Sequence, residues 1–77
     1  MDKEAQTFGM KAVGLDFNPS GSVQVNNLKE AAANFIDQVN NLRDTSDNPE
    51  VKRMASVAIT EAQTAQMWAV KAATWNN

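Results

Sequence analysis

The 77-residue sequence contains no cysteine, no histidine and no tyrosine. Without cysteine the chain has neither disulfides nor thiolate metal sites. Without histidine it lacks the commonest metal ligand and the usual general base near neutral pH. A core of this size is marginally stable unless disulfides, a metal ion or assembly support it. We therefore expect no metal site and no cofactor, and we expect the chain to form a homo-oligomer.

Positive charge is also scarce, with 7 basic against 9 acidic residues and a net charge of −2. This balance argues against a DNA- or RNA-binding protein, which normally presents a basic face, but it leaves binding of a small anion open. No apolar run approaches the roughly 20 residues that span a bilayer, and residues 1–7 lack the apolar core of a signal peptide. We expect no membrane association and a cytoplasmic location.

The residues of an enzyme are missing as well. The carboxylates form no recognisable acid–base pair, and a nucleophile with an adjacent base needs histidine or cysteine, short of unusual Ser/Lys chemistry. Asp44 and Asp47 lack the glycine and terminal glutamate of a calcium loop. We expect Glu61, which begins an uncharged stretch ending at Lys71, to be satisfied by a neighbouring chain. The sequence predicts no catalytic residue and no enzyme.

The last third of the chain predicts one long helix over residues 48–75, capped by Asn48 with Pro49 at its first position. Small residues recur along it at alternating spacings of four and three, which indicates close helix packing; they are Val51, Ala55, Ala58, Ala62, Ala65, Ala69 and Ala72. Larger apolar residues flank this seam on both sides: Met54, Val57, Ile59, Met67, Trp68, Val70 and Trp75. So much apolar surface exceeds what a chain this short can bury, which again favours an oligomer.

Residues 22–43 predict a second, amphipathic helix with Ser22 as its N-cap. Its apolar stripe is formed by Val25, Leu28, Ala32, Phe35, Ile36, Val39 and Leu42. The opposite face carries Lys29, Glu30, Asn34, Asp37 and Asn41. Because a short polar link joins the two helices, we expect an all-α antiparallel helical hairpin forming a single domain over residues 1–77.

The N-terminal part predicts a different structure. Residues 1–7 are polar, and we expect them to fray. Residues 8–21 predict a short extended arm and a turn, because Gly9 and Gly14 disfavour a helix and apolar residues alternate up to Phe17. Asn18, Pro19 and Ser20 begin a run of turn-forming residues.

Two helix starts could bind a phosphate through their backbone N–H groups. The first is the turn at residues 18–22, where Lys11 and Lys29 could lie nearby. The second is the start of the 48–75 helix, where Lys52 and Arg53 oppose the helix dipole. A surface or intersubunit ion pair would explain Arg53 equally well.

Aromatic and hydroxyl side chains leave further alternatives. Phe8 and Phe17 could simply pack the arm onto the hairpin, whereas Phe17 beside Asn18 could stack on a base and bond its edge. The hydroxyl of Thr60, repeated at Thr64, could bond back to its own helix or contact a ligand between chains.

Two segments resemble those of the bacteriophage anti-CBASS and anti-Thoeris sponge proteins. Residues 53–69 (RMASVAITEAQTAQMWA) resemble the second helix of their small hairpin domain, and residues 11–20 (KAVGLDFNPS) resemble the lead-in of one branch. The resemblance implies hexamers that bind cyclic di- or trinucleotides or cyclic ADP-ribose variants between protomers, without cleavage. It also implies ligand contacts for Arg53 and Thr60 on the second helix, and for Lys11, Phe17 and Asn18 in the lead-in.

The sequence thus supports two hypotheses. The first is an immune-evasion protein that sequesters a cyclic nucleotide in the host cytoplasm. The alternative is an oligomeric helical hairpin that binds a host protein through exposed apolar surface. For the first hypothesis the predicted ligand-binding residues are Phe8, Lys11, Phe17, Asn18, Ser20, Lys29, Arg53 and Thr60.

Overall fold

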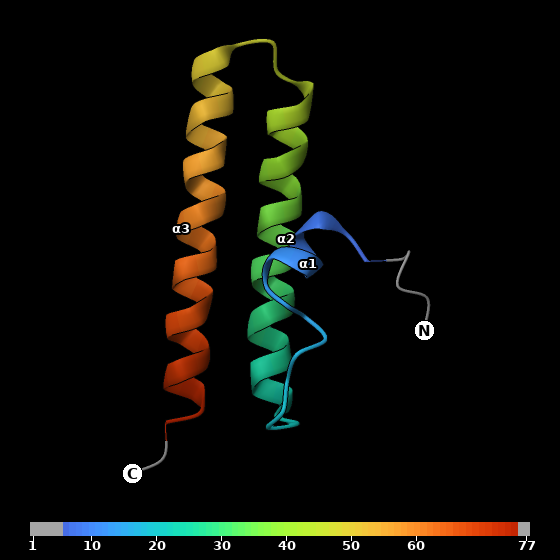
Figure 1. Ribbon diagram of the computed structural model, residues 1–77, viewed down its shortest axis with the longest axis vertical. Helices are drawn as coiled ribbons and strands as arrows, with labels where there is room; N and C mark the ends of the chain where they lie inside the picture. The colour runs from blue at the N-terminus through green and yellow to red at the C-terminus, as the bar shows by residue number, and fades with distance from the viewer. Residues whose placement is uncertain (1–5, 76–77) are drawn as a thin grey trace.

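The computed structural model describes residues 6–75, which form three helices and no strand. They are α1 (Phe8–Ala12), α2 (Val23–Thr45) and α3 (Pro49–Ala73). α2 and α3 run antiparallel side by side, and α1 packs against α2 (Figure 1). The chain forms a flat slab of 46 × 31 × 12 Å, and the predicted all-α helical hairpin is confirmed. Within residues 6–75, no helix is long and apolar enough to cross a membrane.

Both long helices begin directly after a residue whose side chain suits an N-cap. The hydroxyl of Ser22 accepts a hydrogen bond from the Val25 N–H at 3.2 Å, and the Asn48 side chain accepts one from the Glu50 N–H at 2.9 Å. These bonds satisfy N–H groups that have no partner inside the helix. The helices end at Thr45 and Ala73, where the sequence predicted ends at residues 43 and 75.

The core lies between α2 and α3, beneath the segment that follows α1. Its buried cluster is formed by Val13, Ala33, Ile36 and Ile59, and Ile36 is fully buried. On α2 the buried line therefore runs through Ala33 and Ile36. Phe35 and Leu42, which the sequence placed in the apolar stripe, are each about half exposed.

On α3 the predicted seam crosses the hairpin contact obliquely. Ala55 is buried and Ala62 packs against the core, whereas Ala65 and Ala72 are exposed. A repeat that averages 3.5 residues drifts about 20° per seven residues around a straight helix of 3.6 residues per turn. Because of this drift, one row of alanines cannot stay on the α2 side along the whole of α3.

Residues 8–12 of the predicted extended arm form a helix and residues 13–16 form turns, so that prediction was wrong for residues 8–16. Thr7 caps α1 by accepting the Met10 N–H at 3.1 Å, while the Thr7 N–H contacts the Met10 sulfur at 3.4 Å. Gly9 permits close packing on α2, because a Cβ there would lie 2.1 Å from the carbonyl oxygen of Ala33. The Gly9 N–H instead donates to Asp37 Oδ1 at 2.7 Å. Of the residues predicted to fray, 1–5 lie outside the described residues.

Side chains of the hairpin also bind the backbone that follows α1. Gln63 on α3 donates to the carbonyl oxygen of Ala12 at 3.1 Å. Lys29 on α2 donates to the carbonyl oxygens of Gly14, at 3.0 Å, and of Phe17. The prediction that Lys29 lies on the polar outer face was wrong, because it is only 6% exposed. Residues 8–17 therefore pack on their own hairpin.

Candidate functional site

A hollow of about 320 Å³ lies where the start of α2 meets the end of α3. The antiparallel hairpin brings these two ends together at the same end of the slab (Figure 1). The lining residues come from the turn before α2, from α2 itself and from the last turns of α3; they are Phe17, Asn18, Pro19, Ser20, Val25, Lys29, Val70 and Thr74. Four of the eight predicted ligand-binding residues thus meet here.

The turn is held by its own side chains. Asn18 Oδ1 accepts from the Ser20 hydroxyl at 2.7 Å, and Asn18 Nδ2 donates to the Ser22 carbonyl oxygen at 2.9 Å. The Ser22 N–H donates to the Ser20 hydroxyl at 3.1 Å, and Gly21 supplies the positive φ of 66° that closes the turn. The Asn18 amide keeps one N–H and one acceptor position for a ligand.

Lys29, on α2, brings a positive charge to the hollow. Two of the three N–H groups of its ammonium bond the carbonyl oxygens of Gly14 and Phe17, which leaves one donor for a further partner. Within residues 6–75 the only ion pair joins Arg53 and Glu50. The buried charge of Lys29 therefore has no carboxylate partner there, and a buried cation of this kind attracts an anion strongly.

The Phe17 ring forms the outer wall of the hollow. Phe17 is 72% exposed, and the Lys29 nitrogen lies 5.5 Å from the centroid of its ring. The backbone carbonyl of Phe17 is fixed by Lys29 while its ring faces solvent. An exposed aromatic ring beside a cation can stack on a planar base while the cation meets a phosphate.

Sequence reasoning missed the wall contributed by α3. Val70 and Thr74 line the hollow, and the Thr74 hydroxyl donates to the Val70 carbonyl oxygen at 2.8 Å. The short link between the two helices could have predicted that the end of α3 contributes to the site. It fixes an antiparallel register in which the start of α2 must lie beside the end of α3.

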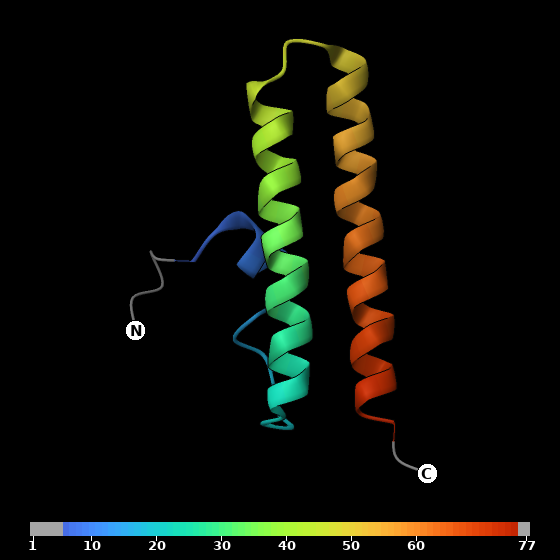
Figure 2. The same ribbon diagram turned by 180° about the vertical axis from the view of Figure 1, so that it is seen from behind.

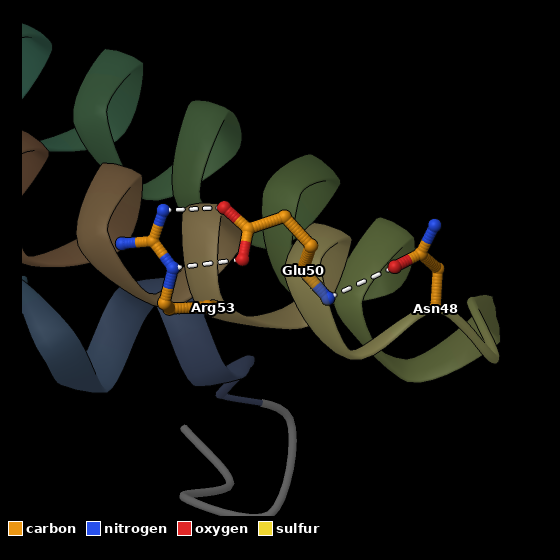
Figure 3. Close-up of polar contacts among 3 residues, drawn as sticks. All are labelled: Asn48, Glu50 and Arg53. Atoms are coloured by element: carbon orange, nitrogen blue, oxygen red, sulfur yellow. Dashed lines mark hydrogen bonds and ion pairs between the residues drawn. The ribbon is translucent and has the colours of Figure 1, made fainter.

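Arg53 lies at the opposite end of the slab, in the first turns of α3 (Figure 1). Its Nη2 and Nε donate to the two oxygens of Glu50 at 2.5 and 3.1 Å, and Asn48 caps the same turn (Figure 3). The hydrogen bond from Arg53 lowers the pKa of Glu50, and the same bond raises the pKa of Arg53. The ion pair considered for Arg53 is thus present within the chain, on an exposed surface.

The three remaining candidates lie apart from the hollow. Phe8 packs beneath the Arg43 guanidinium, whose Cζ lies 5.5 Å from the ring centroid. Lys11 is exposed in the last turn of α1. Thr60 is exposed in the middle of α3, and its carbonyl oxygen accepts the Thr64 hydroxyl at 3.1 Å.

Arg43, which sequence reasoning did not select, connects all three helices. Besides covering Phe8 on α1, it donates to the side chain of Asn40 on α2 at 2.7 Å and to the hydroxyl of Ser56 on α3 at 3.1 Å. These contacts give Arg43 a structural role at the end of the hairpin that lies away from the hollow.

One comparison with known proteins gives a match. The family model for the Acb2/Tad1 hairpin domain matches residues 10–74, which include the hollow and nearly all of the three helices. No curated protein and no solved structure matches the chain.

Proposed function

The chain belongs to the Acb2/Tad1 hairpin-domain family, the anti-CBASS and anti-Thoeris sponge family, and we propose that it sequesters a cyclic nucleotide without cleaving it. The family binds cyclic nucleotide signals of bacterial anti-phage defence. The proposed ligand class is a cyclic di- or trinucleotide or a cyclic ADP-ribose variant. The proposed place of action is the cytoplasm of the infected host, where such signals would have to be withheld from their receptors.

The observation that carries the proposal is the buried ammonium of Lys29, which pairs with no carboxylate among residues 6–75, beside the exposed ring of Phe17. We assign the phosphate of the ligand to the free N–H of Lys29, because charge-assisted bonds to phosphate are among the strongest polar contacts. The base would stack on Phe17, and the unused positions of Asn18 and Ser20 would bond its edge. A net charge of −2 does not oppose this, because one phosphate meets only the local field of the hollow.

The size of the hollow limits how much ligand one chain can enclose. Its volume of about 320 Å³ is at the low end for a small-molecule site, so it suits one nucleotide unit of a cyclic ligand. The rest of the ligand would project outward. We propose that a neighbouring copy of the chain encloses that part, so that the site is completed between protomers.

The positions of the other candidates agree with a shared site. Arg53 and Thr60 lie on α3 and Phe8 and Lys11 on α1, apart from the hollow. A single chain therefore cannot bring all eight predicted residues to one ligand. Contact between copies would let α1 or α3 of one protomer approach a ligand held by the next, and we propose a homo-oligomer, with six copies as the expected number.

Native mass spectrometry tests the proposal directly. The purified protein is mixed in turn with cyclic dinucleotides, cyclic trinucleotides and cyclic ADP-ribose isomers, and the bound mass is read. The protein is then heat-denatured, and the released nucleotide is identified. We expect one ligand class to bind and to leave with unchanged mass. Release of a cleaved product would contradict sequestration, and failure to bind any of these ligands would contradict the proposed function.

A matched pair of variants tests the site itself. Phe17→Ala removes the exposed ring of the hollow and should weaken ligand binding about fivefold or more, because base stacking on an aromatic ring contributes about 1–3 kcal/mol. Met67→Ala removes a side chain that is also exposed, at 60%, but lies outside the hollow, and should leave affinity unchanged. Equal affinities for the two variants would remove Phe17 from the site.

The second candidate function is binding of a host protein. It is favoured by the many large apolar residues that the chain leaves exposed. It requires that no nucleotide binds and that a defined host protein is retained by the purified oligomer.

A further inference from the structure

The two walls of the hollow belong to different parts of the chain. Asn18 and Ser20 come from the turn before α2, whereas Val70 and Thr74 come from α3. A nucleotide unit in the hollow would lie between these walls, so their separation decides which ligand fits. A gap of roughly 0.5–1 Å beyond ideal contact forfeits about a quarter to a half of the dispersion attraction between two atoms. The separation of the walls therefore has to be held closely.

The segment that leads to the turn is attached mainly to α2. Seen from behind, the chain between α1 and α2 runs for most of its length beside α2, on the side away from α3 (Figure 2). On this side, Asp37 accepts the Gly9 N–H and Lys29 donates to the carbonyl oxygen of Gly14. These bonds fix the segment on α2, but they do not fix its distance from α3.

One hydrogen bond connects the segment to α3. Gln63 Nε2 donates to the carbonyl oxygen of Ala12 at 3.1 Å, and within residues 6–75 no other hydrogen bond joins α3 to the chain before α2. Val13 adds apolar contact, because it shares the core cluster with Ile59. Apolar contact is non-directional, however, whereas a hydrogen bond weakens steeply away from its preferred distance and angle. The Gln63 bond therefore determines the separation.

Gln63 lies on the same face of α3 as the wall of the hollow. At 100° per residue, Gln63, Val70 and Thr74 point within about 40° of one another. Gln63 precedes Val70 by two helical turns, or about 10 Å along the axis. Its acceptor, Ala12, precedes Phe17 by five residues. The bond thus joins the two chain segments that separate further on to form the two walls.

We propose that Gln63 is a positioning residue for the nucleotide ligand, because its bond to Ala12 holds the turn and α3 at the separation that the ligand requires. This inference rests on the proposed function. Without the bond the turn would sample wider arrangements, and ligand binding would have to restore the narrow one. Affinity and selectivity therefore depend on Gln63, although its side chain does not line the hollow.

Gln63→Met tests the effect on affinity. Methionine has a similar length and volume but no N–H to donate. The probes are cyclic di-AMP, cyclic di-UMP and cyclic ADP-ribose, and calorimetry gives the Kd of each. A probe that binds the wild type should bind the variant about two- to tenfold more weakly, which is the range that one neutral hydrogen bond can contribute.

The preference between two bases tests the positioning role itself. Cyclic di-AMP and cyclic di-UMP have the same charge and the same number of nucleotide units, but their bases differ in size. Walls held at a fixed separation should favour one of them, and walls that can move apart should distinguish them less. The ratio of the two Kd values should therefore move towards one in Gln63→Met. A role in stability alone would leave this ratio unchanged.

Ser56→Ala is the matched control on the same helix. It removes the hydroxyl that accepts a 3.1 Å hydrogen bond from Arg43 on α2, away from the hollow. Like Gln63→Met, this change alters no charge. Both the affinity and the base preference of Ser56→Ala should equal those of the wild type, and far-UV circular dichroism checks that each variant is helical.

Amide hydrogen exchange without ligand tests the bond separately from binding. The N–H groups of Leu15 and Phe17 donate to carbonyl oxygens within the segment, each at 2.9 Å. In Gln63→Met they should exchange faster, because the segment is released from α3. The Val25 N–H, which is bonded by the Ser22 cap at the start of α2, should exchange as in the wild type.

The outcomes separate this inference from the proposed function. A wild type that binds a probe, together with a Gln63→Met variant of equal affinity and equal base preference, would overturn the role of Gln63 and leave the proposed function standing. Unchanged exchange of Leu15 and Phe17 would overturn it as well, whether or not a probe binds. A wild type that binds none of the three probes would overturn the proposed function, and the role of Gln63 in ligand binding with it.

Discussion

Gly9→Ala should destabilise the protein, although alanine normally stabilises a helix. Gly9 lies inside α1, where helix propensity alone would favour alanine by about 1 kcal/mol. A Cβ at this position, however, would lie 2.1 Å from the Ala33 carbonyl oxygen and 2.8 Å from Asp37 Oδ1. The nearest obstacle is backbone of α2, which cannot turn aside as a flexible side chain can.

The size of the effect follows from the displacement that α1 would need. Ordinary contact begins at 3.4 Å, so the gap from 2.1 Å requires a shift of about 1.3 Å. That shift would break the 2.7 Å bond from the Gly9 N–H to Asp37, a bond to a charged acceptor that contributes about 1.5–3 kcal/mol. Overpacking adds about 1–3 kcal/mol. After the helix-propensity gain, we expect a net loss of about 1.5–5 kcal/mol.

Urea unfolding followed by circular dichroism measures this loss. Wild type and variant must be compared at one protein concentration, because assembly makes stability depend on concentration. Gly21→Ala is the control, because a Cβ at Gly21 meets nothing within 4 Å. The φ of 66° at Gly21 is unfavourable for alanine, so this variant should lose only about 1–2 kcal/mol of stability. If Gly9→Ala proved as stable as the wild type, close packing of α1 on α2 would be refuted.

Three further outcomes are expected. Lys29→Met should lower the unfolding free energy by about 1–3 kcal/mol, because it leaves two carbonyl oxygens without their donor. The control Lys52→Met removes one hydrogen bond from an exposed lysine and should lower it less. Equal losses for the two variants in urea unfolding would contradict the burial of Lys29. Ala62→Leu should cost about 1–3 kcal/mol by overpacking the core, and an unchanged urea midpoint would show that the helices can separate there. Arg53 lowers the pKa of Glu50 from 4.5, so their ion pair stabilises the fold above that pH, and this stabilisation is lost as the pH falls below it. Arg53→Ala should therefore reduce the dependence of the unfolding free energy on pH below 4.5. An unaltered pH dependence would contradict the pairing.

Local signals in the sequence determined the hairpin. Ser22 and Asn48 are polar caps followed by helical periodicity, and both caps bond the N–H groups expected of them. The short link between the helices forced them to pack antiparallel. These features depend on residues within a few positions of one another, which is why a single sequence suffices to predict them.

Only the tertiary structure decided the form of the N-terminal segment. Gly9 was read as a helix breaker, because its use in letting α1 approach Ala33 depends on a residue far along the chain. Helical periodicity places Lys29 on the outer face, opposite the apolar stripe. Its burial follows from the carbonyl oxygens that the folded segment presents to it.

The candidate site divides in the same way. The sequence predicts the turn that holds Phe17, Asn18 and Ser20, because these residues lie next to one another in the chain. The sequence also placed Lys29 near this turn, and the structure confirms that it lines the hollow. The sequence did not show that Val70 closes the hollow, or that the other predicted residues, Lys11 among them, lie elsewhere. Such placements are set by contacts between distant segments, and a one-dimensional pattern does not specify which of several polar residues the folded chain will bring together.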